Sequence, residues 1–377
     1  MKSLKWKQVN AWRLQQHYLA PRLKRRGLVK AVTQTCGIQA QVMSAAELAI
    51  GMRVDGLSPQ KVQSALWQEH SLVKTWAMRS TLHLIAADDL PLYVAARGVH
   101  VSGNWDGYFA YYGIQPAQQE AFLAAVPEVL GDKPMTREQL ATAVAKHTGA
   151  PKLRDLILLS NWGSPLKPSA FRGDLCFGPS QGQNVTFVNP RKWIGEWQSF
   201  EPEQALQEIA RRYLRAYGPA RVEDFMQWWW GWSALIPTRK LFKSLEAELE
   251  EVDVDGWRAF ALRKTLKSME QTEPSGTIRL LPLFDAYVLG LGRDIEPLLP
   301  KAYKPRVFRP QGWISAVVLV DGTMKGVWEY KTRGAQTLVR VRMFSRPGKA
   351  IRSGIEAETE RLADFLNKNV SVEYEDL

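Results

Sequence analysis

Apolar positions along the chain switch between helical and strand-like spacing in an order that recurs. In its first occurrence, helical spacing over 58–70 begins with a Ser-Pro pair, which is typical of a helix start. Two strand-like runs follow, 72–78 and 81–85, and the short break between them at Arg79 and Ser80 predicts a β-hairpin.

A second occurrence begins at Thr136 and Gln139, whose spacing predicts a capping box at a helix start. A further helix is expected over 154–162, and a hairpin over 173–188 with its turn at 178–182. Helix, helix and hairpin in this order are typical of a winged helix.

The third occurrence has helical spacing over 221–232 and 239–251, then a hairpin that turns at Asp255 and Gly256. The four tryptophans within 228–232 are expected in the core of this unit rather than as a surface for base stacking. Three copies of one plan predict three tandem winged-helix units.

The pattern changes near residue 276 to strand-like runs separated by Gly and Pro, with a tight turn predicted at Asp321 and Gly322. A helix over 353–367 and a short acidic tail end the chain. We expect a small barrel or curled sheet here, and an α+β fold overall. The predicted domains are 1–118, 119–200, 201–275 and 276–377.

The balance of charged residues predicts a class of binding partner. Lys and Arg outnumber Asp and Glu by 50 to 38, a net charge of +12. Residues 1–46 hold nine Lys or Arg and no acid, and 331–352 hold seven and no acid. Such segments favour a polyanion, although a merely basic soluble protein is the alternative.

Several function classes are excluded by what the sequence lacks. No apolar run is long enough for a membrane span, and residues 1–16 have no apolar core of a secretory signal. Two cysteines and five scattered histidines predict neither disulfides nor a metal site. The common nucleotide-binding and hydrolase motifs are absent, so we expect no metal and no cofactor.

Candidate chemistry lies in the segment 36–47. Gly37 is expected to end one helix, and Ser44 with Glu47 to form a capping box that begins the next. Gln39 and Gln41 between them share a face if the link is extended, so two carboxamides converge beside a helix N-terminus suited to phosphate. Alternatively, both glutamines are simply solvated or bound to nearby backbone. A carboxamide does not titrate near neutral pH, so it orients water or stabilises a cation instead.

Four phrases in order carry a resemblance. They are Gln39-Ala40-Gln41, "WAMRSTLHLI" at 76–85, "LLPLFDAYVLGLGRD" at 280–294 and "GWISAVVLVDGTMKGVW" at 312–328. Together they resemble the AlkZ/YcaQ family of bacterial DNA glycosylases over about residues 8–367. The second Gln is similar to the AlkZ branch, whereas the YcaQ branch has Asp; Ala40 departs from the larger aliphatic residue usual there.

The resemblance implies a C-shaped protein of three winged helices and a C-terminal β-barrel that holds duplex DNA in a basic channel. It also implies excision of N7-alkylated purines and unhooking of interstrand crosslinks, with Gln39 and Gln41 as catalytic residues. This chemistry is reasonable for carboxamides, because an N7-alkylguanine is cationic and leaves without strong acid assistance. An open cleft is expected in place of a base-flipping pocket, since crosslinked bases cannot rotate freely.

Other candidates follow from the same reading. The expected DNA contacts are Lys24, Arg25, Arg26, Arg79, Gln181, Gln183, Asn184, Arg340 and Arg342. Alternatively, the tip that carries Gln181, Gln183 and Asn184 is an ordinary exposed turn. Arg79 is expected to contact either a DNA phosphate or a carboxylate of the protein. His83, Asp285 and Tyr287 are either channel-lining or buried with internal hydrogen bonds.

The leading hypothesis is therefore a monofunctional glycosylase that acts on double-stranded DNA as a cytoplasmic, nucleoid-associated monomer. No lysine lies in the Gln-x-Gln link to form a Schiff base, so β-elimination is not expected. The alternatives are a winged-helix DNA-binding regulator without chemistry and a module that binds protein alone. The basic segment around the glutamines favours the first hypothesis over the last.

Overall fold

The computed structural model describes residues 2–98, 105–159, 161–231 and 234–376. By its contacts the chain forms two compact units: unit 1 comprises Met1–Val62 and Ala210–Leu377, and unit 2 comprises Gln63–Ile209. The chain passes from one unit to the other within α4 (Pro59–Trp67) and α12 (Pro202–Tyr217). The mixed α+β class is confirmed, whereas three tandem winged-helix units are not.

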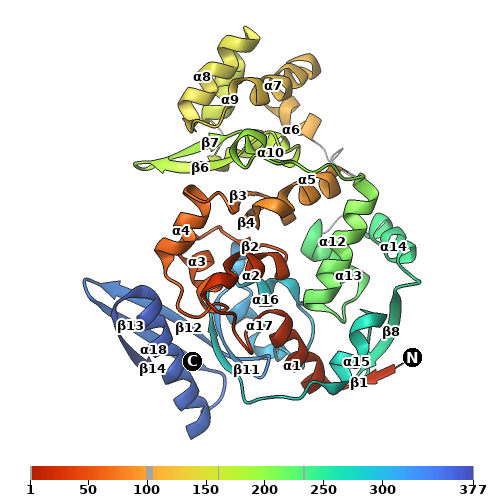
Figure 1. The fold of residues 1–377 in the computed structure, drawn as a ribbon, viewed down its shortest axis with the longest axis vertical. Coiled ribbons are helices and arrows are strands. Elements are labelled where there is room, and N and C mark those ends of the chain that lie inside the picture. Colours follow the sequence, from red (N-terminus) through yellow and green to blue (C-terminus); the bar gives the residue numbers. More distant parts are fainter. Residues whose placement is uncertain (1, 99–104, 160, 232–233, 377) are drawn as a thin grey trace. The chain divides into compact units, whose positions relative to one another are not determined.

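Unit 1 contains two sheets and nine described helices besides α4 and α12 (Figure 1). Their bounds are α1 (Trp6–Gln16), α2 (Leu28–Gln34), α3 (Met43–Gly51), α13 (Val222–Trp229), α14 (Leu235–Ser244), α15 (Arg263–Gln271), α16 (Ala286–Gly290), α17 (Lys304–Val307) and α18 (Lys349–Leu366). Trp228 and Trp229 are buried, as expected for core residues, and Trp232 lies outside the described residues.

The smaller sheet of unit 1 joins the start of the chain to its middle. Its order is β1 (Lys2–Leu4), β8 (Leu249–Val254) and β9 (Trp257–Leu262), with β1 parallel to β8. The hairpin turn at Asp255 and Gly256 is confirmed, and both residues have positive φ. The helix expected through residue 251 is wrong, because Leu249 begins a strand whose alternate side chains enter the core.

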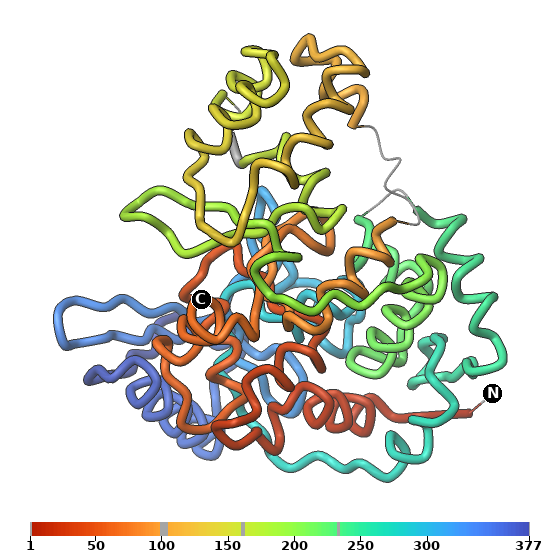
Figure 2. The backbone as a smooth tube through the Cα atoms, turned by 45° about the horizontal axis from the view of Figure 1, so that its top comes forward, coloured from red at the N-terminus to blue at the C-terminus, as the bar shows by residue number. Residues whose placement is uncertain are grey.

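The larger sheet of unit 1 has five strands in sequence order. They are β10 (Ile278–Leu281), β11 (Ala316–Val320), β12 (Thr323–Arg333), β13 (Gln336–Met343) and β14 (Asn369–Tyr374). The turn at Asp321 and Gly322 is confirmed. The expected acidic tail is instead β14, parallel to β13, and the described strands form a half-barrel rather than a closed barrel. Figure 2 shows the β12–β13 hairpin as a long blue loop.

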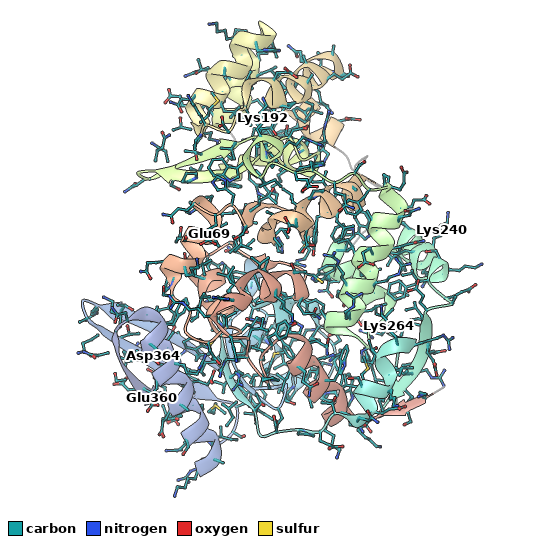
Figure 3. The ribbon with its side chains drawn as sticks, in the orientation of Figure 1. Glu69, Lys192, Lys240, Lys264, Glu360 and Asp364 are labelled. Carbon is teal, nitrogen blue, oxygen red and sulfur yellow. The ribbon has the colours of Figure 1, made fainter. Side chains whose placement is uncertain are left out.

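One face of this sheet is covered by α18, and α3 joins the same core. Leu48 and Met52 pack in one cluster with Trp328, Ile355 and other residues of the sheet and α18. A Cβ at Gly51 would lie only 2.5 Å from the ring of Phe365, so α3 and α18 approach closely there. The outward positions of α18 are charged, as Glu360 and Asp364 illustrate in Figure 3.

Unit 2 has a sheet in which β4 (Leu82–Ala86), β3 (Leu72–Trp76), β6 (Cys176–Gln181), β7 (Asn184–Val188) and β5 (Met135–Thr136) are neighbours in that order. Its helices are α5 (Leu90–Gly98), α6 (Trp105–Tyr111), α7 (Pro116–Val129), α8 (Arg137–Thr148), α9 (Pro151–Leu159), α10 (Lys167–Phe171) and α11 (Pro190–Trp193). Both predicted hairpins are confirmed. The capping box is confirmed too, with the Gln139 amide donating to Thr136 Oγ1.

Two details of unit 2 differ from expectation. The hairpin turns at Gly182 and Gln183, later than predicted, because β6 continues through a register shift between Gly178 and Gln181. The helix expected over 154–162 begins earlier, at Pro151, and Ser160 lies outside the described residues. No helix of the described residues has the length and apolar character needed to cross a membrane.

Candidate active site

The Gln-x-Gln segment is an extended link between two helices of unit 1. After α2 ends at Gln34, Cys36 and Gly37 take positive φ values of 57° and 91°, and the Gly37 amide donates to the Val32 carbonyl at 2.9 Å. This closed helix end turns the chain into β2 (Ile38–Gln39), and α3 begins at Met43. The extended link expected from the sequence is thus present.

The two glutamines differ in exposure. Gln39 is 7% exposed, Ala40 is buried behind the link, and Gln41 is exposed. Neither glutamine is without an interaction partner. The carboxamide of Gln39 is therefore buried in unit 1, whereas that of Gln41 is open to solvent. That both converge on one substrate atom stays a prediction.

Ser44 does not cap α3. The N-cap is Val42, with extended backbone and no side-chain cap, so the expected Ser44–Glu47 capping box is wrong. Ser44 already lies inside the first turn, and it lines the same cavity as Tyr330 of β12. Burial raises the pKa of Tyr330, so the phenol stays neutral at physiological pH.

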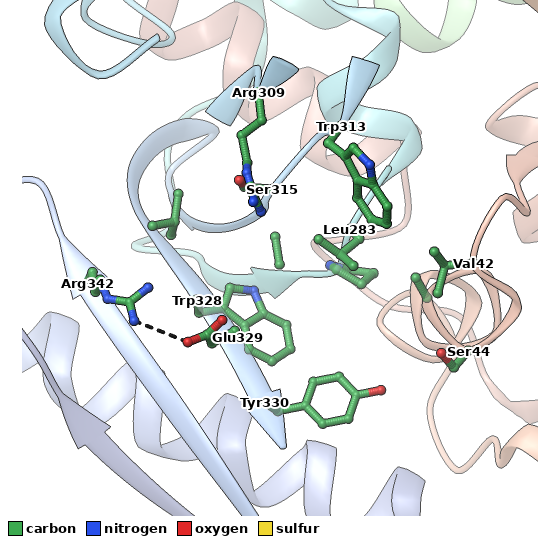
Figure 4. Close-up of a pocket in the computed structure, with 14 residues that line it drawn as sticks. Val42, Ser44, Leu283, Arg309, Trp313, Ser315, Trp328, Glu329, Tyr330 and Arg342 are labelled. Atoms are coloured by element: carbon green, nitrogen blue, oxygen red, sulfur yellow. Dashed lines mark hydrogen bonds and ion pairs between the residues drawn. The ribbon is translucent and has the colours of Figure 1, made fainter. Parts of the chain in front are cut away.

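A cavity of about 320 Å³ lies directly beside this link (Figure 4). Val42 and Ser44 form one side, and the strands of the half-barrel, with Trp328 and Tyr330, form another. Trp313 also lines it and is 41% exposed. Nothing in the sequence phrases indicated this cavity, because its walls come from five separate segments.

A buried ion pair holds the far end of α3. Arg53 donates through Nη1 and Nη2 to the two carboxylate oxygens of Asp285, both at 2.8 Å, and also to the Ala49 carbonyl. Both side chains of the pair have zero exposure. Asp285 in turn accepts from the Tyr287 amide at the start of α16. α3 is therefore fixed to α16 by a buried ion pair, although Nε of Arg53 is buried without a hydrogen-bond partner among the described residues.

Asp285 and Tyr287 had been expected either at the channel or in the interior. Tyr287 is buried and donates to the Gly322 carbonyl at 3.0 Å, and burial raises the pKa of its hydroxyl. A channel-lining role needs exposed atoms, which these two side chains lack. Asp285 instead holds Arg53, which follows α3, and Tyr287 binds the Gly322 carbonyl in the interior of unit 1. Sequence reasoning missed Arg53, which no local pattern distinguishes from a surface arginine.

The basic segment at the start of the chain contains paired and unpaired cations. Four cations are in ion pairs: Lys2 with Glu270, Lys5 with Asp255, Lys7 with Glu273 and Arg22 with Glu358. Lys24, Arg25 and Arg26 are exposed in the turn before α2. Within the described part of the chain, no hydrogen bond or ion pair neutralises these three side chains. They form an uncompensated cationic turn.

Arg340 and Arg342 of β13 have a different environment. Arg340 lies 3.2 Å from Glu375, and Arg342 lies 2.7 Å from Glu375 and 3.1 Å from Glu329. Glu329 belongs to β12 and Glu375 directly follows β14, so the acid-free run in the sequence is not acid-free in space. The charge of the two arginines is therefore largely compensated.

The predicted DNA-contacting residues of unit 2 lie on two features. Gln181, Gln183 and Asn184 are exposed at the tip of the β6–β7 hairpin (Figure 1). Arg79 lies in the turn between β3 and β4 with φ of 54°, and its Nη2 is 3.5 Å from Nε2 of His83. The tip presents polar groups to solvent, as a groove-reading hairpin requires.

His83 is buried and neutral. Its Nδ1 lies 2.9 Å from the Thr81 carbonyl, which fixes the proton on that nitrogen, and Nε2 faces Arg79. Burial, and then the charge of Arg79, lowers the pKa of His83 to about 3. The imidazole is 2% exposed and has no surface for lining a channel, so it positions the turn that carries Arg79. Among the described residues no cluster of His, Cys, Asp and Glu is suited to a metal ion.

Comparison with known proteins assigns the chain to a family. The family described as "DNA glycosylase AlkZ-like" matches residues 32–365. A relative from Streptomyces sahachiroi, the "Interstrand DNA cross-link repair glycosylase", is 38% identical over 86% of this chain and 87% of its own. The solved structure of Streptomyces sahachiroi DNA glycosylase AlkZ is similar over 100% of both chains, with a TM-score of 0.87 and 35% identity. The protein therefore belongs to the AlkZ-like family and is a DNA glycosylase.

Proposed function

We propose that this glycosylase hydrolyses the N-glycosidic bond of N7-alkylated purines in duplex DNA, with Gln39 and Gln41 at the reacting sugar. The observation that carries the proposal is the extended link, which places two carboxamides between helix ends in the unit that also holds the cationic turn at 24–26. No titratable side chain belongs to the link itself.

The chemistry suits carboxamides because the substrate is activated already. When the bond from C1′ to N9 breaks, its electron pair neutralises the positive charge of the alkylated base, which leaves as a neutral molecule. The sugar becomes oxocarbenium-like, and a water oxygen bonds to C1′ while its proton passes to solvent. Carboxamide oxygens orient that water and stabilise the developing positive charge without accepting a proton.

Recognition of DNA is assigned to two surfaces in this proposal. The cationic turn of Lys24, Arg25 and Arg26 contacts phosphates in unit 1, and the exposed tip at Gln181, Gln183 and Asn184 enters a groove in unit 2. Phosphate contacts position the duplex without reading sequence, which suits an enzyme that finds lesions anywhere. The enzyme acts as a monomer and needs no cofactor.

The name of the Streptomyces relative extends the proposal to interstrand crosslinks. A crosslink between N7 atoms consists of two alkylated purines, and release of either one separates the strands. The same water attack at C1′ therefore unhooks a crosslink, provided that the site admits the tethered base.

The test is incubation with an oligonucleotide duplex that carries one N7-methylguanine, followed by alkaline cleavage of abasic sites. We expect Gln39→Ala and Gln41→Ala each to lower the excision rate by about 10²-fold or more, the usual loss for a polar group that acts on a transition state. Their affinity for the duplex should stay within about threefold, since phosphate contacts are untouched.

A matched control is Gln336→Ala, which removes an exposed glutamine at the start of β13, away from the link. Parental excision by both link variants would refute the catalytic assignment. Gln41→Asp refines it: retained excision indicates that polarity suffices at this position, whereas complete inactivity indicates that geometry governs the site.

A further inference from the structure

We propose that the cavity beside the link binds the cationic base of an N7-alkylated purine by stacking on Trp313, with Arg309 at its rim contacting a phosphate. The proposal rests on the proposed function for the identity of the substrate. Its evidence is the geometry and charge of the cavity walls, all of which belong to unit 1.

Trp313 is a large aromatic ring left open at the cavity. Trp313 is 41% exposed. Its ring also packs against the ring of Phe284, and the two ring centroids are 5.2 Å apart. Figure 4 shows its indole beside the cavity, opposite Trp328 and Tyr330. A planar base that enters here meets aromatic surfaces, which stack on any base and favour cationic ones.

The other charged groups of the cavity wall are paired. Glu329 and Arg342 lie 3.1 Å apart, and Arg342 also pairs with Glu375, so recognition of a cation rests on the aromatic rings. The remaining cation, Arg309, has no hydrogen-bond or ion-pair partner for its guanidinium among the described residues. An arginine without a counter-charge at the edge of a cavity is suited to a phosphate of the same strand.

Size and position are consistent with one base. The volume of about 320 Å³ is at the lower end of ligand cavities, about 300–1,000 Å³. Val42 lines the cavity, and the Cα of Gln41 is one peptide away, about 3.8 Å. A base seated in the cavity therefore has its sugar near the link. The base of a monoadduct, which is not tethered to the opposite strand, is free to rotate into this position.

The first test is binding of 7,9-dimethylguaninium, a permanently cationic base without a sugar. The protein labelled with 5-fluorotryptophan has 15 tryptophan positions, and the ¹⁹F line missing from Trp313→Phe identifies Trp313. We expect the cation to shift this line and neutral 9-methylguanine, of similar size, to shift it only at higher concentration.

The second test is excision of N7-methylguanine from a duplex. Trp313→Ala should lower kcat/KM by about 5- to 150-fold, the range for loss of one stacked base, and Trp313→Phe should recover most of it. Tyr111→Ala is the control, because that ring is 83% exposed and lies outside the cavity.

The outcomes separate this proposal from the proposed function. If the parent excises N7-methylguanine while the Trp313 line does not move and Trp313→Ala is fully active, the cavity is not the base site and the function stands. If the parent excises no N7-methylguanine but the cation shifts the Trp313 line, the substrate assignment fails and the cavity stands as a site for a planar cation. A loss of excision in Trp313→Ala without any response to the cation would overturn the stacking assignment.

Discussion

Replacement of the cationic turn should change how the affinity for DNA depends on salt. The perturbation is Lys24→Ala, Arg25→Ala and Arg26→Ala together. All three side chains are exposed, and within the described chain none has a counter-charge, so each is available to a phosphate. Binding to a phosphate releases condensed counterions, and each contact adds about −0.9 to the slope of log affinity against log salt.

The expected size follows from this count. One contact changes the affinity by about 3.5-fold between 50 and 200 mM salt, and three contacts change it by about 40-fold. The triple variant should therefore have a slope that is flatter by about 2.7, for modified and unmodified duplexes alike. Fluorescence anisotropy of a labelled duplex at four or five salt concentrations measures the slope directly.

Two comparisons make the measurement decisive. Lys7→Ala removes a cation that is paired with Glu273, so its slope should stay at the parental value. Arg340→Ala and Arg342→Ala should flatten the slope by much less than 0.9 each, because Glu329 and Glu375 already compensate them. A triple variant with the parental slope would refute the reasoning and move the DNA track elsewhere on the protein.

Further predictions concern the buried charges and the hairpin. Asp285→Asn leaves Arg53 buried without a counter-charge and should lower the free energy of unfolding by about 3–5 kcal/mol in a urea titration; a loss below about 1 kcal/mol would contradict the buried pair. His83 stays neutral in the folded protein, because its pKa is lowered to about 3, whereas in the unfolded chain it binds a proton below about pH 6.5. Its contribution to the free energy of unfolding therefore falls as the pH drops below 6.5. Between pH 7.5 and 5, the free energy of unfolding of His83→Gln should therefore decrease by about 2 kcal/mol less than that of the parent. An equal decrease in both proteins would count against the lowered pKa. Gln183→Ala with Asn184→Ala should weaken duplex binding without changing the urea midpoint; unchanged affinity would make the tip an ordinary exposed turn.

Local signals in the sequence were sufficient for the short-range structure. The turns at Asp255–Gly256 and Asp321–Gly322 and the capping box at Thr136 depend on residues at most a few positions apart, and the structure has all of them. The link around Gln39 and Gln41 was found for the same reason, because helix ends on either side define it.

Long-range structure was beyond such signals. Arg53 and Asp285 are 232 positions apart, and nothing near either residue specifies the other. The acids that compensate Arg340 are likewise distant in sequence: Glu373 belongs to β14 and Glu375 directly follows it, in a segment that the sequence indicated only as a tail. Ser44 fits a capping-box pattern, yet α3 already begins at Met43 with Val42 as its N-cap, so Ser44 lies inside the helix and does not cap it.

The discontinuous make-up of unit 1 has a consequence for how the enzyme is produced. The first 62 residues carry the glutamine link, but the partners of that segment are strands and helices made after residue 210. During synthesis on the ribosome, the link therefore emerges long before β8, α16 or the half-barrel exists to bury its supports. Unit 2 has all of its strands and its own core within one continuous stretch and can collapse first. Under the proposed role of Gln39 and Gln41, a chain translated only through residue 210 therefore lacks the strands and helices that support its catalytic link.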